Sequence, residues 1–429
     1  MTPDQRWFER RPWLALTAGG AGLFFLSFVL VRFGWLAHGQ ISDTWLYMRY
    51  GDAIVHHGQV PYRDFQLEYP PGALPIFILP SLAEPFDYAR SVQLEMLACG
   101  IAAVAAAATA LRASGVPPRR AAIALAVIGL SPLLIGPLVL SRFDLWPSAL
   151  TVGAVAAFAA RRDRAGGVAL GLAIAAKLYA VALLPLVVID VWRRRGARAA
   201  ARIAMLALAT AGVIFLPFII LAPSGVAEPI TRQFDRPLQV ESLGSAILIA
   251  VHQLNHMHIH TYGYLGSDNL DSPGEGVARV VTSALGPLAI LLVCVAYARG
   301  PAGRARFCTA AAATVTLFVA FDKVLSPQYM LWLVPLVPLA IGAARGWLNL
   351  VLLAAVLMLT QSWYPQHYVV MADRYHEPWT WVLLLRDVLL VVLGLSLALA
   401  IRPHAAAVLR HHRDLRPGVA VTDLRRSPG

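Results

Sequence analysis

The side chains best suited to chemistry are concentrated in one stretch near the start of the chain, Ser42–Gly72. It holds four carboxylates and two arginines, although only 14% of the 429 residues are charged. These residues are Asp43, Asp52, Asp64, Glu68, Arg49 and Arg63. A polar, aromatic-rich loop positioned by an apolar scaffold is typical of a functional site. We therefore treat this loop as the candidate site.

Asp43 stands at the start of the loop, soon after a long apolar segment. A carboxylate is small and normally ionised, so Asp43 could act as a general base that takes a proton from a substrate hydroxyl. However, Ser42 and Asp43 also precede a helical pattern over Thr44–Val55, and both residue types are good helix N-caps. The residues alone leave catalysis and capping open.

The second half of the loop, Pro61–Gly72, predicts a rigid turn because its prolines restrict the backbone. Three aromatic rings in it could contact a ligand or lie at the membrane interface: Tyr62, Phe65 and Tyr69. Arg63 could pair with Asp64 or Glu68 and hold the turn, or these three residues could bind a substrate. The residue types are compatible with both interpretations.

Three later clusters each place a cation at or near the end of an apolar helix, where it needs a partner. They are Ser141-Arg142-Phe143-Asp144, Lys177-Leu178-Tyr179, and Asp322-Lys323-Val324-Leu325-Ser326-Pro327-Gln328-Tyr329. Arginine and lysine neutralise phosphate charge well, so Arg142, Lys177 and Lys323 are candidates to bind a phosphate group. The alternative is local ion pairing, of Arg142 with Asp144 and of Lys323 with Asp322, while Lys177 extends its ammonium to the interface.

Four histidines, His252, His256, His258 and His260, lie in a long polar segment. His252 and His256 are spaced to share one face of a helix, as metal ligands can be. No acidic residue or cysteine stands at ligand spacing beside them. We therefore expect polar loop residues here and no metal site.

The composition indicates what must position these residues. Hydrophobic residues make up 58% of the chain and the mean hydropathy is +0.62, values that predict a polytopic membrane protein. A net charge of +12 would suggest nucleic-acid binding in a soluble protein, but here the arginines lie between apolar segments. The three cysteines lie in or beside apolar segments and predict neither a disulfide framework nor a metal knuckle.

A membrane crossing needs roughly 20 apolar residues, and we expect about ten crossings in an all-α fold. They are Trp13–Ala37, Ala89–Leu111, Ala121–Val139, Leu145–Ala160, Ile203–Ala222, Gly276–Tyr297, Phe307–Leu325, Tyr329–Ala344, Trp347–Tyr364 and Trp381–Ile401. The arginine clusters between them predict cytoplasmic termini and an extracytoplasmic first loop at residues 39–72. Ala73–Ala83 is too short to cross and is expected to be interfacial or re-entrant.

Gly166–Trp192 is apolar but has arginine clusters on both flanks, so a single crossing would put one cluster on the wrong side of the membrane. Two half-helices that turn near Lys177 and Tyr179 avoid this conflict. Broken helices at membrane depth are tolerated where they line protein or a watery cavity, so we expect the turn to border the site.

We expect one transmembrane domain over residues 1–402, followed by a basic cytoplasmic tail at residues 403–429. The first apolar helix follows Arg6, Arg10 and Arg11, and we interpret it as a retained signal anchor.

Taken in order, these motifs resemble the GT-C membrane glycosyltransferases of actinobacteria, specifically glycosyltransferase family 87. The residues that carry the resemblance are Asp43, the string Gly58 to Gly72, Arg142-Phe143-Asp144, Lys177-Leu178-Tyr179 and Ser326-Pro327-Gln328-Tyr329-Met330-Leu331-Trp332. The resemblance implies a GT-C fold in the plasma membrane and an inverting transfer from a polyprenyl phosphate sugar, most often mannose. It implies no nucleotide-sugar site, no cofactor and no obligatory metal.

The resemblance also suggests roles for individual residues. Asp43 matches the family's first-loop catalytic aspartate, and Arg142, Lys177 and Lys323 are the candidates for the donor phosphate. The candidates for other substrate contacts are Arg63, Asp64, Glu68, Tyr69, Asp144, Tyr179, Gln328 and Tyr329. The expected acceptor is a cell-envelope glycolipid or polysaccharide.

Other functions stay open at this stage. Arabinofuranosyltransferases belong to the same family, and a lipid or sugar transporter would also combine broken helices with intramembrane cations. A purely structural membrane scaffold is a third alternative. The acid-rich first loop and the lack of a visible inverted repeat favour an enzyme.

Overall fold

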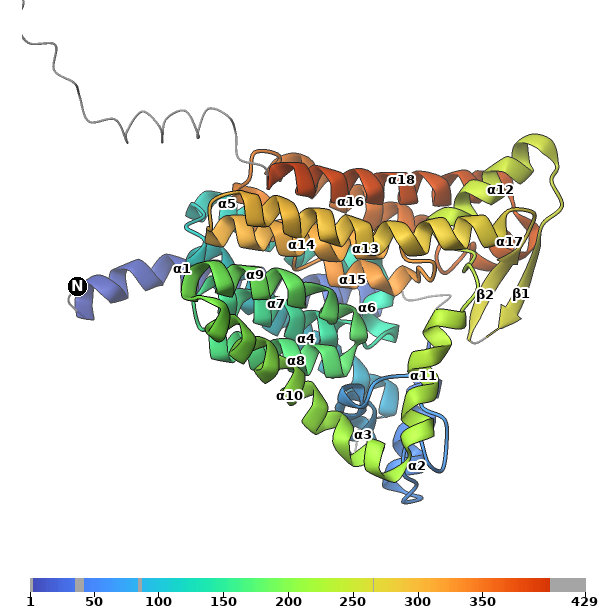
Figure 1. Cartoon of the computed structure of the whole chain (residues 1–429), viewed down its shortest axis with the longest axis horizontal. Coiled ribbons are helices and arrows are strands. Elements are labelled where there is room, and N and C mark those ends of the chain that lie inside the picture. Colours follow the sequence, from blue (N-terminus) through green and yellow to red (C-terminus); the bar gives the residue numbers. More distant parts are fainter. Residues whose placement is uncertain (1–2, 35–41, 84–86, 265, 402–429) are drawn as a thin grey trace, which may run out of the picture.

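The computed structural model describes residues 3–34, 42–83, 87–264 and 266–401, which form a bundle of helices with similar axis directions (Figure 1). Within these residues, seven helices are long and apolar enough to cross a membrane. They are α1 (Pro3–Phe33), α4 (Tyr88–Ala113), α5 (Pro118–Ile135), α10 (Ala197–Leu221), α13 (Glu275–Arg299), α16 (Gly346–Trp363) and α18 (Glu377–Ala400). The chain is therefore an all-α polytopic membrane protein, as predicted.

The other three predicted crossings fall short of the roughly 20 residues that a membrane crossing needs. The helix α7 (Leu145–Ala159) has 15 residues and α14 (Arg304–Ala320) has 17, of which 13 are buried. The third segment is divided into α15 (Met330–Leu333) and the 3-10 helix η5 (Val337–Gly342). Hydropathy cannot distinguish an apolar helix that faces lipid from one enclosed by protein, and only the former has to match the bilayer thickness.

The predicted half-helix pair is confirmed. The helix α8 (Asp163–Ala176) ends just before Lys177, and the 3-10 helix η3 (Leu178–Leu183) leads into α9 (Leu184–Arg195). Arg194 Nη2 lies 2.8 Å from Asp163 Oδ1, so the start of α8 and the end of α9 meet. The segment is a helical hairpin, and its tip carries Lys177 into the interior of the protein.

The arginine-rich ends of several helices meet at one end of the bundle, which we call the basic end. There Arg304 donates to Ala113 O (3.2 Å), Arg306 to Ile401 O (2.7 Å) and Arg193 to Tyr297 O (3.1 Å). These contacts bring the ends of α4, α9, α13, α14 and α18 together, which is the segregation that the positive-inside pattern predicts.

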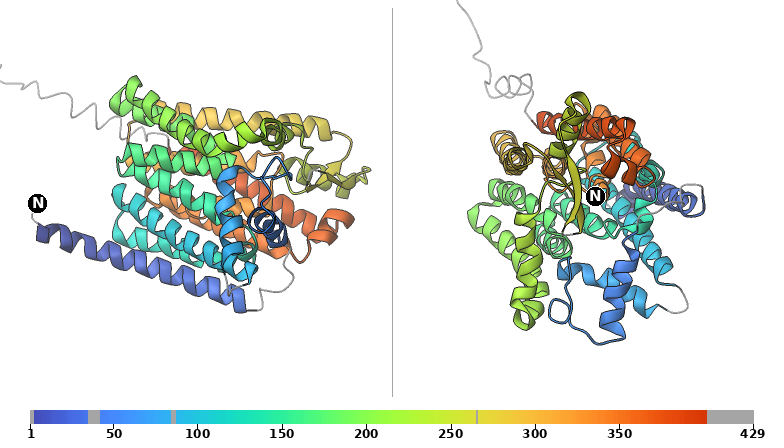
Figure 2. Two further views of the ribbon diagram at one scale, coloured as in Figure 1. Left: turned by 90° about the horizontal axis from the view of Figure 1, so that it is seen from below. Right: turned by 90° about the vertical axis from the view of Figure 1, so that its right-hand side faces the viewer.

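The opposite end, which we call the cavity end, carries the smaller elements (right side of Figure 1). They are α2 (Thr44–Val55), η2 (Pro71–Ala73), α3 (Leu74–Leu82), α6 (Leu138–Ser141), α11 (Pro223–Asp235), α12 (Leu243–Asn255), η4 (Pro327–Tyr329) and α17 (Tyr368–Arg374). Viewed onto this end, the blue first-loop segment and the red C-terminal helices lie on opposite sides (Figure 2, right).

The structure has a short β-hairpin at the cavity end, which the prediction of an all-α fold did not include. Strands β1 (His260–Tyr264) and β2 (Ser267–Asp271) pair antiparallel, with Tyr262 opposite Asn269. An isolated two-stranded hairpin is marginally stable in water. Here β2 is also bonded to the preceding loop, since Leu270 N donates to Leu238 O (2.9 Å) and Val240 N donates to Asp268 O (3.0 Å).

An aromatic cluster attaches the first loop to the bundle. Tyr47 of α2 stacks on Phe77 of α3 at 4.7 Å between ring centroids, and Tyr69 packs edge-on against Phe143 at 5.0 Å. Gly51 lets α2 approach α3 closely, because a side chain there would collide with the Phe77 carbonyl. The rings that follow Asp43 in sequence therefore form a core that orients Arg142 and Asp144, the neighbours of Phe143.

Candidate active site

A large cavity of about 1770 Å³ occupies the cavity end of the bundle. Its walls come from the first loop, the tip of the α8–α9 hairpin, α11, the β-hairpin and the loop between α14 and α15. Nine of the predicted site residues line it: Asp43, Glu68, Tyr69, Arg142, Lys177, Tyr179, Lys323, Gln328 and Tyr329. Segments separated by almost 300 residues thus meet around one space.

Asp43 points into this cavity and forms an ion pair with Arg142. Although Asp43 occupies the N-cap position of α2, its side chain makes no capping hydrogen bond within the described part of the chain. The Ser42 hydroxyl accepts from Thr44 N instead, at 3.1 Å. The Asp43 side chain is 26% exposed and that of Arg142 is 8% exposed, so the carboxylate is accessible from the cavity while its partner is buried.

Arg142 is held from a second direction by the C-terminal half of the chain. Its Nη2 donates to Tyr364 Oη at 2.7 Å, and Tyr364 follows the last residue of α16. A guanidinium fixed between a carboxylate and a phenol has a defined orientation, because its N–H groups form a rigid planar fork. The Asp43 carboxylate is thereby also fixed in position.

A second ion pair lies beside the first. Lys177 Nζ donates to Asp144 Oδ1 at 2.5 Å, and Trp332 Nε1 donates to the same oxygen at 2.8 Å. Asp144 is 1% exposed and lies behind the cavity wall, whereas Lys177 is part of that wall. A lysine has three N–H donors, and Asp144 occupies one of them.

Aromatic rings surround the Lys177 ammonium. Trp332 is sandwiched between Tyr179, at 3.9 Å between centroids, and Tyr329, at 4.1 Å. The ammonium nitrogen lies 5.1 Å from the Trp332 centroid and 4.8 Å from that of Phe143. Ring faces attract cations, so this environment stabilises a charge that is otherwise shielded from water.

Two of the local ion pairs considered from sequence, Arg142–Asp144 and Asp322–Lys323, do not form among the described residues. Arg142 bonds to Asp43 rather than to Asp144, and Asp144 bonds to Lys177. Lys323 donates to Phe234 O at 2.7 Å, while Asp322 accepts from Val324 N at 3.0 Å. Arg142 and Asp144 are therefore each paired with a charge that is distant in sequence.

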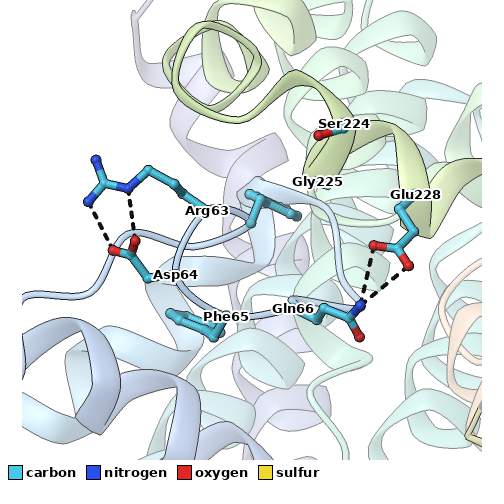
Figure 3. Close-up of a pocket in the computed structure, with 8 residues that line it drawn as sticks. Arg63, Asp64, Phe65, Gln66, Ser224, Gly225 and Glu228 are labelled. Carbon is cyan, nitrogen blue, oxygen red and sulfur yellow. Dashed lines mark hydrogen bonds and ion pairs between the residues drawn. The ribbon is translucent and has the colours of Figure 1, made fainter.

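Arg63 and Asp64 lie outside the large cavity, in a neighbouring pocket (Figure 3). They pair with each other through two hydrogen bonds of 2.9 Å. Hydrogen bonding from Arg63 lowers the pKa of Asp64 to about 2, so this carboxylate is ionised at neutral pH. The interpretation of the two residues as an ion pair in the turn is confirmed.

Sequence reasoning did not identify Glu241, which lines the cavity although it is only 2% exposed. Gln239 Nε2 donates to its carboxyl group, and Arg386 Nη2 donates to its backbone oxygen at 3.0 Å. Burial raises the pKa of Glu241 to about 8. Its position in a long polar loop resembles that of any solvent-exposed acid, so the sequence contained no signal for its burial.

The cavity continues as an apolar groove between α10 and α13. Its lining includes Ile189 of α9, Phe215 of α10, Ile290 and Cys294 of α13, and Phe318 of α14. Cys294 lies about 18 Å along α13 from Thr282, the first residue of this helix that lines the cavity, at 1.5 Å per residue. The groove therefore reaches from the polar residues deep into the apolar part of the bundle.

Two of the four histidines in the long polar segment, His252 and His256, are positioned by local structure. His252 Nδ1 lies 2.6 Å from Met257 O, and His256 adopts a left-handed conformation at the C-terminus of α12. Within the described ranges, no three His, Cys, Asp or Glu side chains are arranged to hold a metal ion.

The sequence of the chain matches the model of a known protein family. The family model described as "Mannosyltransferase (PIG-M)" matches residues 144–399, more than half of the chain, which include Asp144, Lys177, Lys323 and Tyr364. The match supports a GT-C glycosyltransferase, while the assignment to family 87 stays a prediction. No curated protein matches the chain by sequence.

Among solved structures, the chain is similar to the Archaeoglobus fulgidus oligosaccharyltransferase in complex with Zn and sulfate. The identity is 15% and the TM-score 0.38, over 95% of this chain. The chain spans 56% of the length of that protein.

Proposed function

The chain belongs to the PIG-M mannosyltransferase family, and from this premise we propose that it transfers mannose from a polyprenyl phosphate donor to a hydroxyl group of a cell-envelope glycolipid or polysaccharide. One observation carries the proposal: a single cavity joins an accessible carboxylate, a buried cation and a long apolar groove. These are the parts that a lipid-linked sugar donor needs from a transferase.

The apolar groove between α10 and α13 suits the polyprenyl chain of the donor. Its lining is aliphatic and aromatic, and the two helices that border it are both candidate membrane spans. A donor anchored there keeps its lipid in an apolar environment while its phosphate reaches the polar part of the cavity.

Lys177 is the best-placed cation for the donor phosphate. It lies in the cavity wall and uses one of its three donors on Asp144, so the other two can turn toward an anion. When the bond between the sugar and the phosphate breaks, negative charge builds up on the departing polyprenyl phosphate. A preorganised cation stabilises that charge. Arg142 and Lys323 line the same cavity and can contribute.

Asp43 is the proposed general base. The oxygen of the acceptor hydroxyl attacks the anomeric carbon, the bond from that carbon to the phosphate oxygen breaks, and the hydroxyl proton passes to the Asp43 carboxylate. Arg142 and Tyr364 fix the orientation of this carboxylate. A well-positioned base contributes roughly 10²–10⁴-fold to such a step.

The orientation of the protein follows from its charge distribution. The basic end is proposed to face the cytoplasm, with both termini on that side, and the cavity end to face outward from the plasma membrane. Donor and acceptor would then meet on the extracytoplasmic side.

The test is transfer of labelled mannose from polyprenyl phosphate mannose to membrane lipid extract by the purified protein in detergent. A new labelled glycolipid supports the proposal. If transfer occurs only from polyprenyl phosphate arabinofuranose, the donor sugar is arabinofuranose and not mannose. Absence of transfer from both donors, together with movement of either donor across sealed proteoliposomes, would contradict the enzyme assignment in favour of a transporter.

A further inference from the structure

A second, smaller pocket of about 560 Å³ lies beside the large cavity, between the first loop and the start of α11. We call it the outer pocket; it is lined by Tyr62, Arg63, Asp64, Phe65, Gln66, Ser224, Gly225 and Glu228. Figure 3 shows the Gln66 amide bonded to the Glu228 carboxylate at one side of it, with Ser224 and Gly225 also on α11. The mechanism above makes no use of this pocket.

The first-loop wall of the outer pocket is held in one conformation. Tyr62 has a left-handed backbone (φ 67°), and its N–H donates to Phe65 O at 3.0 Å. The Asp64 carboxylate accepts from Val60 N at 2.7 Å, and Tyr62 Oη donates to Tyr69 O at 2.6 Å. A turn that is bonded at so many points offers its polar groups to a ligand without a large ordering cost.

The opposite wall is fitted closely to this turn. A side chain at position 225 would collide with the Tyr62 carbonyl, so Gly225 allows α11 to pack directly against the turn. Gln66 Nε2 also lies 3.3 Å from both carboxylate oxygens of Glu228. The pocket is thus a defined space between two elements that touch.

The polar groups of the pocket suit hydroxyl groups rather than phosphate. Asp64 and Glu228 provide carboxylate acceptors, Gln66 an amide and Ser224 a hydroxyl. The cation within the pocket, Arg63, is already neutralised by Asp64, and Glu228 also pairs with Arg232. A phosphate would meet the ionised carboxylate of Asp64 here, whereas a sugar ring offers donors and acceptors to the same groups.

The outer pocket adjoins the large cavity. Tyr62, Gln66, Gly225 and Glu228 line both spaces. Gln66 lines both spaces, and the next residues up to Pro70 line the large cavity alone, a distance along the loop of at most about 14 Å for four residues. A ligand long enough to span this distance can therefore contact both spaces.

We propose that the outer pocket is a second acceptor subsite, which binds a sugar unit of the acceptor that is remote from the reacting hydroxyl. This inference rests on the proposed transferase function. It predicts that the protein prefers acceptors with several sugar units and that this preference depends on α11 and the 62–66 turn.

To test the proposal, the Ser224→Trp substitution fills the outer pocket with an indole ring. Ser224 is suitable because it is exposed and lines the outer pocket but not the large cavity. The matched control is Ala227→Trp, at an exposed position of α11 outside both spaces. Each protein is assayed with polyprenyl phosphate mannose and with octyl mannoside or octyl mannotrioside as acceptor. Ser224→Tyr serves as a smaller replacement if the tryptophan variant does not fold.

We expect KM for the mannotrioside to rise about tenfold in Ser224→Trp, as for the loss of one or two hydrogen bonds. KM values for the donor and for octyl mannoside stay unchanged, and Ala227→Trp behaves as wild type. An equal change for both acceptors, or no change, overturns the subsite.

Binding of free mannotriose, followed by saturation-transfer NMR, decides the subsite even without turnover. Signal in the wild type that is lost in Ser224→Trp supports it, and equal or absent signal in both proteins contradicts it. Absence of transfer to any acceptor would count against the proposed function alone.

Discussion

Replacing Lys177 by methionine removes the cation that faces Asp144 while keeping a side chain of similar length. Asp144 is 1% exposed, and it would keep only the hydrogen bond from Trp332 Nε1 at 2.8 Å. Removing one partner of a buried ion pair typically costs about 3–5 kcal/mol of stability. Because the hydrogen bond from Trp332 remains, we expect the lower part of that range.

A second variant separates stability from catalysis. In Lys177→Met/Asp144→Asn the buried charge is gone, and the asparagine oxygen can still accept from Trp332. We expect apparent thermal stability in detergent to recover most of the loss. Transfer from polyprenyl phosphate mannose should remain about 10²–10³-fold below wild type, because the proposed cation for the leaving phosphate is still missing.

The control is Arg90→Met, which removes an exposed cation that pairs with Asp87 outside the cavity. It should change neither stability nor transfer noticeably, since exposed pairs contribute little. Recovery of transfer in the double variant would refute a catalytic role for Lys177 and leave it a purely structural one. Unchanged stability in Lys177→Met would refute the expected cost of breaking the buried ion pair between Lys177 and Asp144.

Three further outcomes are expected. Tyr364→Phe removes the hydroxyl that Arg142 donates to, and kcat should fall about three- to tenfold with little change in folding, which circular dichroism and transfer assays check. Burial raises the pKa of Glu241 to about 8, so the folded protein binds a proton at this carboxyl group more tightly than the unfolded chain does. The stability that this proton contributes is full below the pKa of the unfolded chain and is lost as pH rises through 8. Thermal unfolding from pH 5 to 9 should show this loss in the wild type, and an unchanged slope in Glu241→Gln would contradict it. Excess EDTA should leave transfer intact, and a loss of activity that Mg²⁺ or Mn²⁺ restores would show that a metal is needed.

The break at Lys177 was predictable because it follows from a conflict within the sequence. Arginine clusters flank an apolar segment on both sides, and only a hairpin places both on one side of the membrane. The structure shows that hairpin, with Arg194 bonded to Asp163 where its two ends meet. Rules that depend on local charge and hydropathy therefore predicted this feature correctly.

The ion pairs of the site were not predictable in the same way. Asp43 and Arg142 are 99 residues apart, and Asp144 and Lys177 are 33 apart, so their pairing depends on how the helices pack. The sequence suggested neighbours such as Arg142 and Asp144 as partners because only proximity along the chain is visible there. The burial of Glu241 and the formation of the β-hairpin are likewise consequences of tertiary packing.

The most direct test of the account is the transfer rate of Asp43→Asn, at matched expression, with polyprenyl phosphate mannose as donor. Asparagine keeps the size of the side chain but cannot take up the proton. The matched control is Asp52→Asn, an exposed carboxylate on the same helix that lies outside the cavity. The account predicts that kcat falls at least ~10²-fold in Asp43→Asn, with the donor KM nearly unchanged, and that Asp52→Asn retains wild-type transfer. Wild-type transfer by Asp43→Asn would contradict the assignment of Asp43 as the general base.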